Sequence, residues 1–144
     1  MAQQVFAGGR IQEIYRLRLD RGQMLLESIL DTVRKNNIQD GAVLTAAGSL
    51  SECTYHRVKA LGPKPEDEFI TVKGPIEILN INGLIAAQEP HLHLTLSTDK
   101  GAFGGHLEKG CQVLYRAEIT IAKFSGPALA RKPNKDGVPV LQSK

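Results

Sequence analysis

Three of the four histidines in this 144-residue chain fall within sixteen residues of one another. His91 and His93 are separated by Leu92, in a segment where polar and apolar residues alternate as far as Ser97. Such alternation predicts a β-strand, in which side chains two positions apart share a face. The two imidazoles should therefore lie on one face, with their Cα atoms roughly 6.5–7 Å apart. At that spacing they can converge on a single ion, because first-row metals take histidine nitrogen at about 2.0–2.1 Å.

His106 is the natural third ligand. A turn at residues 99–101 precedes it, so the returning chain can lie beside the strand at 91–97. Gly104 and Gly105 allow the backbone to bend and to approach a neighbour closely. Three neutral imidazoles suit Zn²⁺, with Ni²⁺, Cu²⁺ or Fe²⁺ as competitors. The spacing predicts a site for one divalent metal, with zinc favoured. Water, a substrate atom or a neighbouring subunit would take the fourth position.

Three acidic residues are candidates to orient the imidazole rings by hydrogen bonding: Glu89, Glu108 and Glu118. A three-histidine zinc site leaves one position open, where a bound water becomes acidic near pH 7. If the site is catalytic, Glu89 or Glu118 is the candidate general base. The chain contains no nucleophile elbow, P-loop or His-Glu-x-x-His motif, so no catalytic residue is assigned independently of the metal. The alternative is that the histidines are only the polar face of a solvated strand.

Three further residues have simpler interpretations. His56 has no other histidine near it in the sequence, and an ordinary surface or hydrogen-bonding histidine is expected there. Two cysteines, Cys53 and Cys111, are too few for a disulfide scaffold and are expected to be free, buried thiols. Cys111, five residues after His106, is a weaker candidate for an additional metal ligand.

The elements that would position these residues are mostly strands. Apolar residues recur at helical spacing from Met24 to Val33, which predicts one amphipathic helix ending near Asn36. Gly74-Pro75 is expected to interrupt a strand, and Gly104-Gly105 to break the chain. One helix with many antiparallel strands is typical of a single α+β domain. Strands are predicted at residues 10–20, 42–50, 52–59, 69–72, 76–87, 91–97 and 112–122.

Composition is that of an ordinary globular domain, with 42% hydrophobic and 23% charged residues. No stretch approaches the ~20 apolar residues of a membrane span. The N-terminus lacks the basic start and apolar core of a secretory signal. A cytoplasmic protein with no membrane partner is therefore expected.

Charge is distributed unevenly along the chain. Residues 123–144 hold five basic side chains and one acidic side chain, whereas the first 122 residues hold thirteen basic and fourteen acidic ones. Any binding to duplex DNA should therefore be weak and depend on the C-terminal segment. We expect a flexible N-terminus at 1–9, one domain at 10–124, and a basic, proline-containing and poorly ordered tail at 125–144.

Several motifs in a fixed order resemble the plant-and-prokaryote-conserved (PPC) domain. Glu89–Ser97 contains Pro-His-Leu-His-Leu, Phe103–Cys111 contains Gly-Gly-His-Leu, and Val113–Ile119 follows them. Gly74–Leu79 matches an earlier motif of the family. The resemblance extends from about Arg10 to Ala122 and is far more specific than any single motif.

The resemblance implies an antiparallel sheet flanked by helices, a homotrimer, and a metal held by the matching histidines. With the helix pattern above, the expected fold is α+β: a mainly antiparallel sheet flanked by one long and few short helices. Plant members attach the domain to AT-hook segments that bind the DNA minor groove, and prokaryotic members are assigned a DNA-binding role by analogy. This chain has no Arg-Gly-Arg-Pro hook.

Two functions follow from the sequence as expectations. The first is a metal-binding, homotrimeric module with a regulatory or DNA-associated role. The alternative is a small metal-dependent enzyme that acts on a small-molecule substrate or ligand at the metal. A metal site closed by a fourth protein ligand would favour the first function, and an open position in a deep pocket would favour the second.

Overall fold

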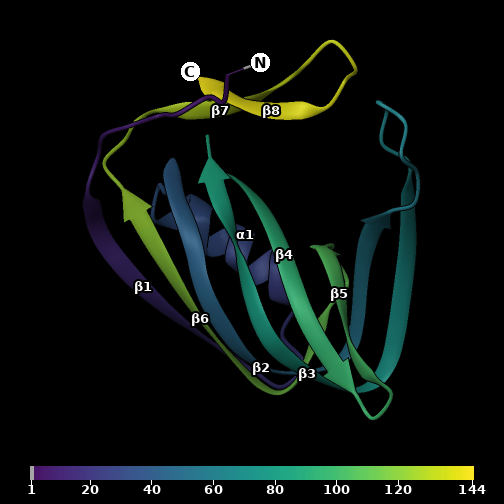
Figure 1. Cartoon of the computed structure of the whole chain (residues 1–144). Helices are drawn as coiled ribbons and strands as arrows, with labels where there is room; N and C mark the ends of the chain where they lie inside the picture. The colour runs from purple at the N-terminus through teal and green to yellow at the C-terminus, as the bar shows by residue number, and fades with distance from the viewer. Residues whose placement is uncertain (1) are drawn as a thin grey trace.

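A six-stranded antiparallel sheet in the order β1-β6-β2-β3-β4-β5 and one helix form the body of residues 2–144, which the computed structural model describes (Figure 1). A two-stranded hairpin, β7-β8, completes the chain. Over these residues no helix has the length and hydropathy required to span a bilayer. The elements are β1 Ile11–Asp20, α1 Leu25–Lys35, β2 Asp40–Val58, β3 Asp67–Ala86, β4 Glu89–Thr98, β5 Gly101–Leu107, β6 Gln112–Phe124, β7 Leu129–Pro133 and β8 Pro139–Ser143.

Helix α1 packs against one face of the sheet, and the amphipathic helix predicted from the sequence is present (Figure 1). Its buried side chains are Leu25, Ile29 and Val33, which recur at the four-residue spacing of one helix face. The prediction of one long and few short helices was wrong. Within residues 2–144 there is one helix, and it has only 11 residues. Asn37 ends it by taking a left-handed backbone conformation with φ of 47°.

Strands β2 and β3 are longer than the sequence indicated, because each joins two segments predicted as separate strands. The pairing register shifts where Leu50 opposes Ile76 and Glu52 opposes Lys73. Gly74 and Pro75 together oppose the single residue Ser51 in a β-bulge, so they bend β3 without ending it. Pro75 lacks a backbone N–H, and a bulge is a place in a strand where that donor is not needed.

Strand β5 closes part of the sheet, because it pairs with β4 on one side and with β2 on the other. Gly104 and Gly105 were predicted to interrupt regular structure, but both lie within strand β5. A Cβ on Gly104 would overlap the carbonyl group of Leu94, and one on Gly105 would overlap that of His56. Glycine at both positions therefore lets β5 fit between its two neighbours, and the predicted close approach is confirmed.

Residues 125–144, expected to be a poorly ordered tail, contain the hairpin of β7 and β8 at the top of Figure 1. The backbone N–H of Leu129 donates to Oδ1 of Asp40 at 3.0 Å. Two side-chain bonds from Arg131 to the backbone of the main sheet add to this anchor. Residues 2–10 form neither helix nor strand, and Met1 lies outside the described residues. The domain limits at 10 and 124 stay predictions.

Candidate metal centre

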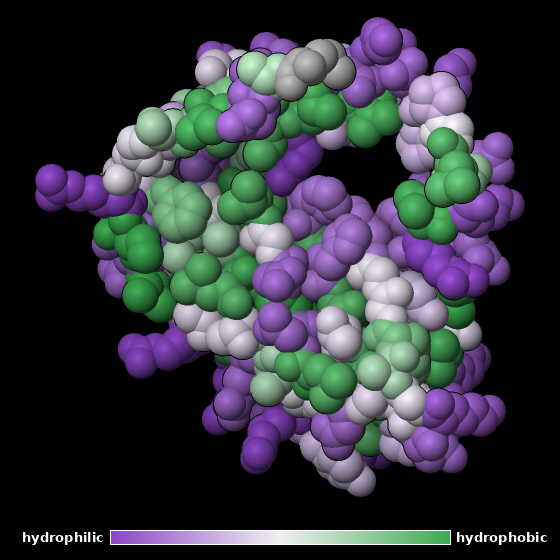
Figure 2. Space-filling model, in the orientation of Figure 1, coloured by the Kyte–Doolittle hydropathy of each residue, from purple (hydrophilic) through white to green (hydrophobic). Residues whose placement is uncertain are grey.

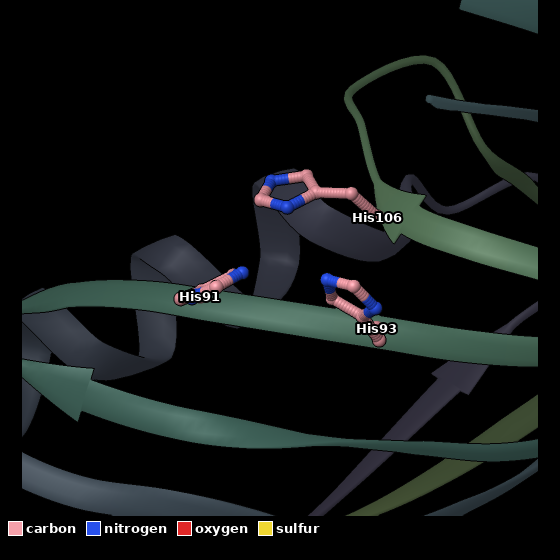
Figure 3. Close-up of side chains that lie close together, drawn as sticks. All are labelled: His91, His93 and His106. Atoms are coloured by element: carbon pink, nitrogen blue, oxygen red, sulfur yellow. The ribbon is translucent and has the colours of Figure 1, made fainter. Parts of the chain in front are cut away.

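The three histidines predicted as metal ligands lie together on neighbouring strands (Figure 3). His93 on β4 is the register partner of His106 on β5, and His91 is two residues before His93 on the same face. The alternation predicted for β4 is confirmed, because Leu92, Leu94 and Leu96 are buried on the opposite face. One nitrogen from each of the three rings lies within 4.8 Å of the other two.

The chemistry and spacing of these donors fit a divalent metal. Two histidine nitrogens on one tetrahedral zinc ion are about 3.4 Å apart, given Zn–N distances of about 2.0–2.1 Å. The observed nitrogen–nitrogen separations lie within 4.8 Å, so small rotations of the side chains would bring the three nitrogens to that spacing. His91 and His93 are exposed and His106 is half-buried, so the trio is open to solvent on one side.

Burial and neighbouring positive charge keep two of the three rings neutral. Burial lowers the pKa of His106 to about 4, and His56 and His91 add to this effect. Burial also lowers the pKa of His91, helped by Arg131 and His93. A metal binds only the unprotonated imidazole nitrogen, so lowered pKa values leave more of each ring ready to bind at neutral pH.

His56 joins the cluster, although no other histidine stands near it in the sequence. On β2 it is the register partner of His106, and the two rings stack with centroids 4.2 Å apart. Its Nδ1–H donates to Oε1 of Glu108 at 2.6 Å, and its Nε2 lies 3.8 Å from Asp67. The predicted hydrogen-bonding role is confirmed. The proximity to His106 was missed because only the β2–β5 pairing, fifty residues apart in the chain, creates it.

Of the three candidate carboxylates, Glu108 is the one that contacts a histidine. It also forms, with His56 and His106, a second group of potential ligand atoms within 4.8 Å of one another. Glu89 lines a neighbouring pocket that His106 also lines. Glu118 lies on β6, where its carboxylate is 3.8 Å from Arg116 in a pocket that no histidine lines.

The two cysteines are free and buried, as predicted. Their sulfur atoms are 3.4 Å apart, and Sγ of Cys111 also lies 3.3 Å from the carbonyl oxygen of Thr54. Cys111 belongs to neither group of potential ligands found among residues 2–144. The structure therefore assigns Cys111 to the core beside Cys53.

An open pocket of about 270 Å³ adjoins His91 and His93. It lies between the main sheet and the hairpin β7-β8, which supplies Arg131, Pro139 and Leu141 to its wall. In the space-filling view the surface is hollowed between this hairpin and the outer ends of β2 and β3 at the right, with hydrophilic residues below the hollow and hydrophobic ones along its upper and right borders (Figure 2). The histidine centre is thus accessible to a small molecule.

An antiparallel sheet with one packed helix and a cluster of histidines on adjoining strands defines a small α+β domain with a candidate metal centre. The family model described as the Plants and Prokaryotes Conserved (PCC) domain matches residues 6–125, and the chain belongs to this family. The family indicated by the sequence motifs is confirmed.

One curated relative is the bifunctional protein GlmU of Synechococcus sp. strain JA-2-3B'a(2-13), which is 35% identical over 123 residues. The match includes 85% of this chain and 18% of the relative. The chain therefore spans less than a fifth of the length of the curated relatives it matches.

Three solved structures share the fold across nearly the whole chain. A plant- and prokaryote-conserved protein from Pyrococcus horikoshii is 28% identical with a TM-score of 0.81, and the match includes 96% of this chain and 97% of that one. A metal-containing protein from Archaeoglobus fulgidus is 23% identical with a TM-score of 0.82, over 97% and 99% of the two chains. A candidate DNA-binding protein from Bacteroides thetaiotaomicron is 20% identical with a TM-score of 0.77, over 93% and 94%.

Proposed function

We propose that this PCC-domain protein is a metal-dependent binding module in which His91, His93 and His106 hold one divalent ion, with zinc favoured. The carrying observation is that nitrogens from all three rings converge within 4.8 Å on two paired strands. The name of the Archaeoglobus fulgidus relative, a metal-containing protein with the same fold, supports the proposal.

Three protein ligands leave one coordination position for a small molecule. A zinc ion held there would act as a Lewis acid that binds an oxygen or nitrogen atom of that molecule. The adjoining pocket of about 270 Å³ gives the molecule room. A regulatory role follows if binding of this molecule changes the partners of the module.

An open coordination position beside a pocket would favour the enzyme, but the placement of the candidate general bases favours binding. A small metal-dependent enzyme would need a general base beside the ion. Glu118 lines a pocket without histidines, and Glu89 lines a pocket that includes His106 but neither His91 nor His93. Oε1 of Glu108 is already hydrogen-bonded to Nδ1 of His56 at 2.6 Å, so this carboxylate is engaged elsewhere.

Metal analysis of the purified, zinc-loaded protein tests the proposal. We expect one ion per chain in the wild type and almost none in His93→Ala. Thr95→Ala is the matched control, because Thr95 is exposed on the same face of β4 and two residues from His93. His56→Ala should also keep one ion per chain, since Glu108 already occupies its Nδ1. Equal metal content in the wild type and His93→Ala would eliminate the site.

The module is proposed to act as a homotrimer, as the family resemblance implies. Large apolar side chains are exposed on three strands, with Ile14 48%, Leu44 46% and Leu79 52% exposed. An assembly would cover such side chains, whereas a monomer would leave them in water. Light scattering in moderate salt should give three times the chain mass of 15.7 kDa. A mass of one chain would contradict the assembly.

DNA association is a second candidate function. The name of the Bacteroides thetaiotaomicron relative favours it, as does the concentration of basic residues in 123–144. Binding of this kind would rely on phosphate contacts and would be weak.

A further inference from the structure

Arg131 brings a positive charge from the C-terminal hairpin to the edge of the histidine centre. Its Nη1 donates to the carbonyl oxygen of Glu89 at 2.6 Å, and its Nη2 donates to that of Leu84 at 3.0 Å. Leu84 on β3 is the register partner of His91 on β4. The two bonds therefore fix the guanidinium beside the strand that carries His91 and His93.

This charge has no close counterion. Within residues 2–144 no carboxylate oxygen lies within 4 Å of the Arg131 guanidinium, although the side chain is half-buried. Burial lowers the pKa of Arg131, and the charge of Glu89 only partly opposes this effect. An arginine nevertheless stays protonated in proteins. The two bonds to carbonyl groups use two of its five N–H donors, so the others can donate to an anion.

The lining of the pocket beside Arg131 is partly polar and partly apolar. Its polar residues are His91 and His93 on β4 and Asn82 on β3, and its apolar residues, called here the apolar wall, are Leu84 on β3 and Pro139 and Leu141 on β8. At about 270 Å³ the pocket is smaller than the ~300–1,000 Å³ typical of sites for drug-sized ligands. Its occupant should accordingly be a small molecule with one anionic end and one apolar end.

We infer that the ligand of this module is a small organic carboxylate. One carboxylate oxygen takes the open position at the metal, the other accepts hydrogen bonds from Arg131, and the apolar group packs against Leu84, Pro139 and Leu141. This inference rests on the proposed metal site. A carboxylate suits both contacts, because the planar guanidinium fork matches carboxylate geometry and zinc accepts oxygen ligands. Inorganic phosphate could satisfy the charge but would leave the apolar wall without a contact.

The inferred specificity depends on a segment beyond the part of the chain that the family model matches. That match ends at residue 125, whereas Arg131, Pro139 and Leu141 belong to β7 and β8. Of the residues inferred to select the ligand, only Leu84 therefore lies within the matched segment that carries the metal centre. Substitutions in the hairpin can alter ligand binding without removing a metal ligand.

Calorimetry on the zinc-loaded full chain tests the inference with four probes. Isobutyrate should bind, and isobutyramide, which has the same shape without the charge, should bind at least about tenfold more weakly. Acetate, which has only a methyl group, and inorganic phosphate, which has no apolar group, should also bind more weakly than isobutyrate. Equal affinities for isobutyrate and isobutyramide, or tighter binding of phosphate, would overturn the inference.

Two variants and one control separate the contributions of the hairpin. Arg131→Gln should weaken isobutyrate binding about tenfold or more while one zinc per chain remains. Lys132→Gln removes the same charge from the next residue, which is exposed and on the opposite side of β7, and should bind as the wild type does. Leu141→Ala should weaken isobutyrate binding about threefold and leave acetate binding unchanged.

Metal content decides which proposal a negative result concerns. If zinc loads fully but Arg131→Gln binds isobutyrate like the wild type, the carboxylate inference is wrong and the metal site stands. If zinc does not load, the proposed function itself fails. Arg131→Gln also removes two hydrogen bonds that hold the hairpin, so Leu141→Ala serves as an independent test. An unchanged isobutyrate affinity in Leu141→Ala would refute the assignment of the apolar wall.

Discussion

His106 is the central residue of the histidine cluster. Its ring centroid is 4.2 Å from that of His56, 5.0 Å from that of His91 and 5.5 Å from that of His93. It is half-buried and joins both groups of potential ligand atoms. A positive charge on this ring would be poorly solvated and close to other rings, which is why burial dominates the lowering of its pKa to about 4.

This lowered pKa makes the stability of the metal-free protein depend on pH. An unfolded histidine protonates near pH 6.5, whereas the folded His106 does so only near pH 4. The unfolded state therefore binds the proton first, and the stability contributed above pH 6.5 is lost as the pH falls towards 4. The loss should be on the order of 1 kcal/mol, because solvent screens a half-exposed group.

Urea unfolding in the presence of a chelator measures this effect. The unfolding midpoint of the wild type should fall between pH 6.5 and 4, and that of His106→Gln should fall less over the same range. Parallel decreases in the two proteins would show that His106 does not carry the pH dependence.

At the scale of elements, β5 determines which side chains meet. Its pairing with β2 and β4 places His56, His106 and His93 in one row across three strands. Gly105 permits this packing, because a Cβ there would lie 2.5 Å from the carbonyl oxygen of His56 and 2.9 Å from Cδ2 of Tyr55. The histidine cluster thus depends on a residue that has no side chain.

Gly105→Ala should therefore destabilise the protein and weaken the metal centre. Overpacking of this kind costs about 1–3 kcal/mol, and separation of β5 from β2 would displace His106. Urea unfolding and zinc content are the measurements. Gly62→Ala is the control, since a Cβ at Gly62 would meet no atom within 4 Å. If both variants unfold like the wild type, the close approach of β5 to β2 is not needed for stability.

These same strands show most clearly which features could be predicted from the sequence and which could not. Alternation in residues 91–97 predicted β4, its buried leucines and the shared face of His91 and His93, because the two-residue period is a local property. The β2–β5 pairing could not be predicted in this way, since it joins residues fifty positions apart. Glycine and proline signals were also ambiguous: Gly74-Pro75 marks a bulge and Gly104-Gly105 a close contact, although both pairs read locally as interruptions.

At the scale of the whole molecule, some of the basic side chains in residues 123–144 are already hydrogen-bonded to the rest of the fold. Nζ of Lys123 donates to the carbonyl oxygen of Asn36 at 3.0 Å, and Arg131 donates to two carbonyl groups of the main sheet. Of the five basic side chains in residues 123–144, Lys132, Lys135 and Lys144 have no such bond among residues 2–144. Those three are the ones best able to contact phosphates.

Binding to duplex DNA should consequently be weak and should respond only moderately to salt. Each phosphate neutralised contributes about −0.9 to the slope of log K against log salt concentration. Three lysines per chain therefore limit the slope to about −3 per chain. Fluorescence anisotropy with a duplex at several salt concentrations measures it, and the triple variant Lys132→Gln, Lys135→Gln, Lys144→Gln should lose most of the binding. The triple variant keeps Arg131 and its two bonds, so the hairpin stays anchored. Nanomolar, sequence-specific binding that survives these substitutions would mean that another surface of the domain binds DNA.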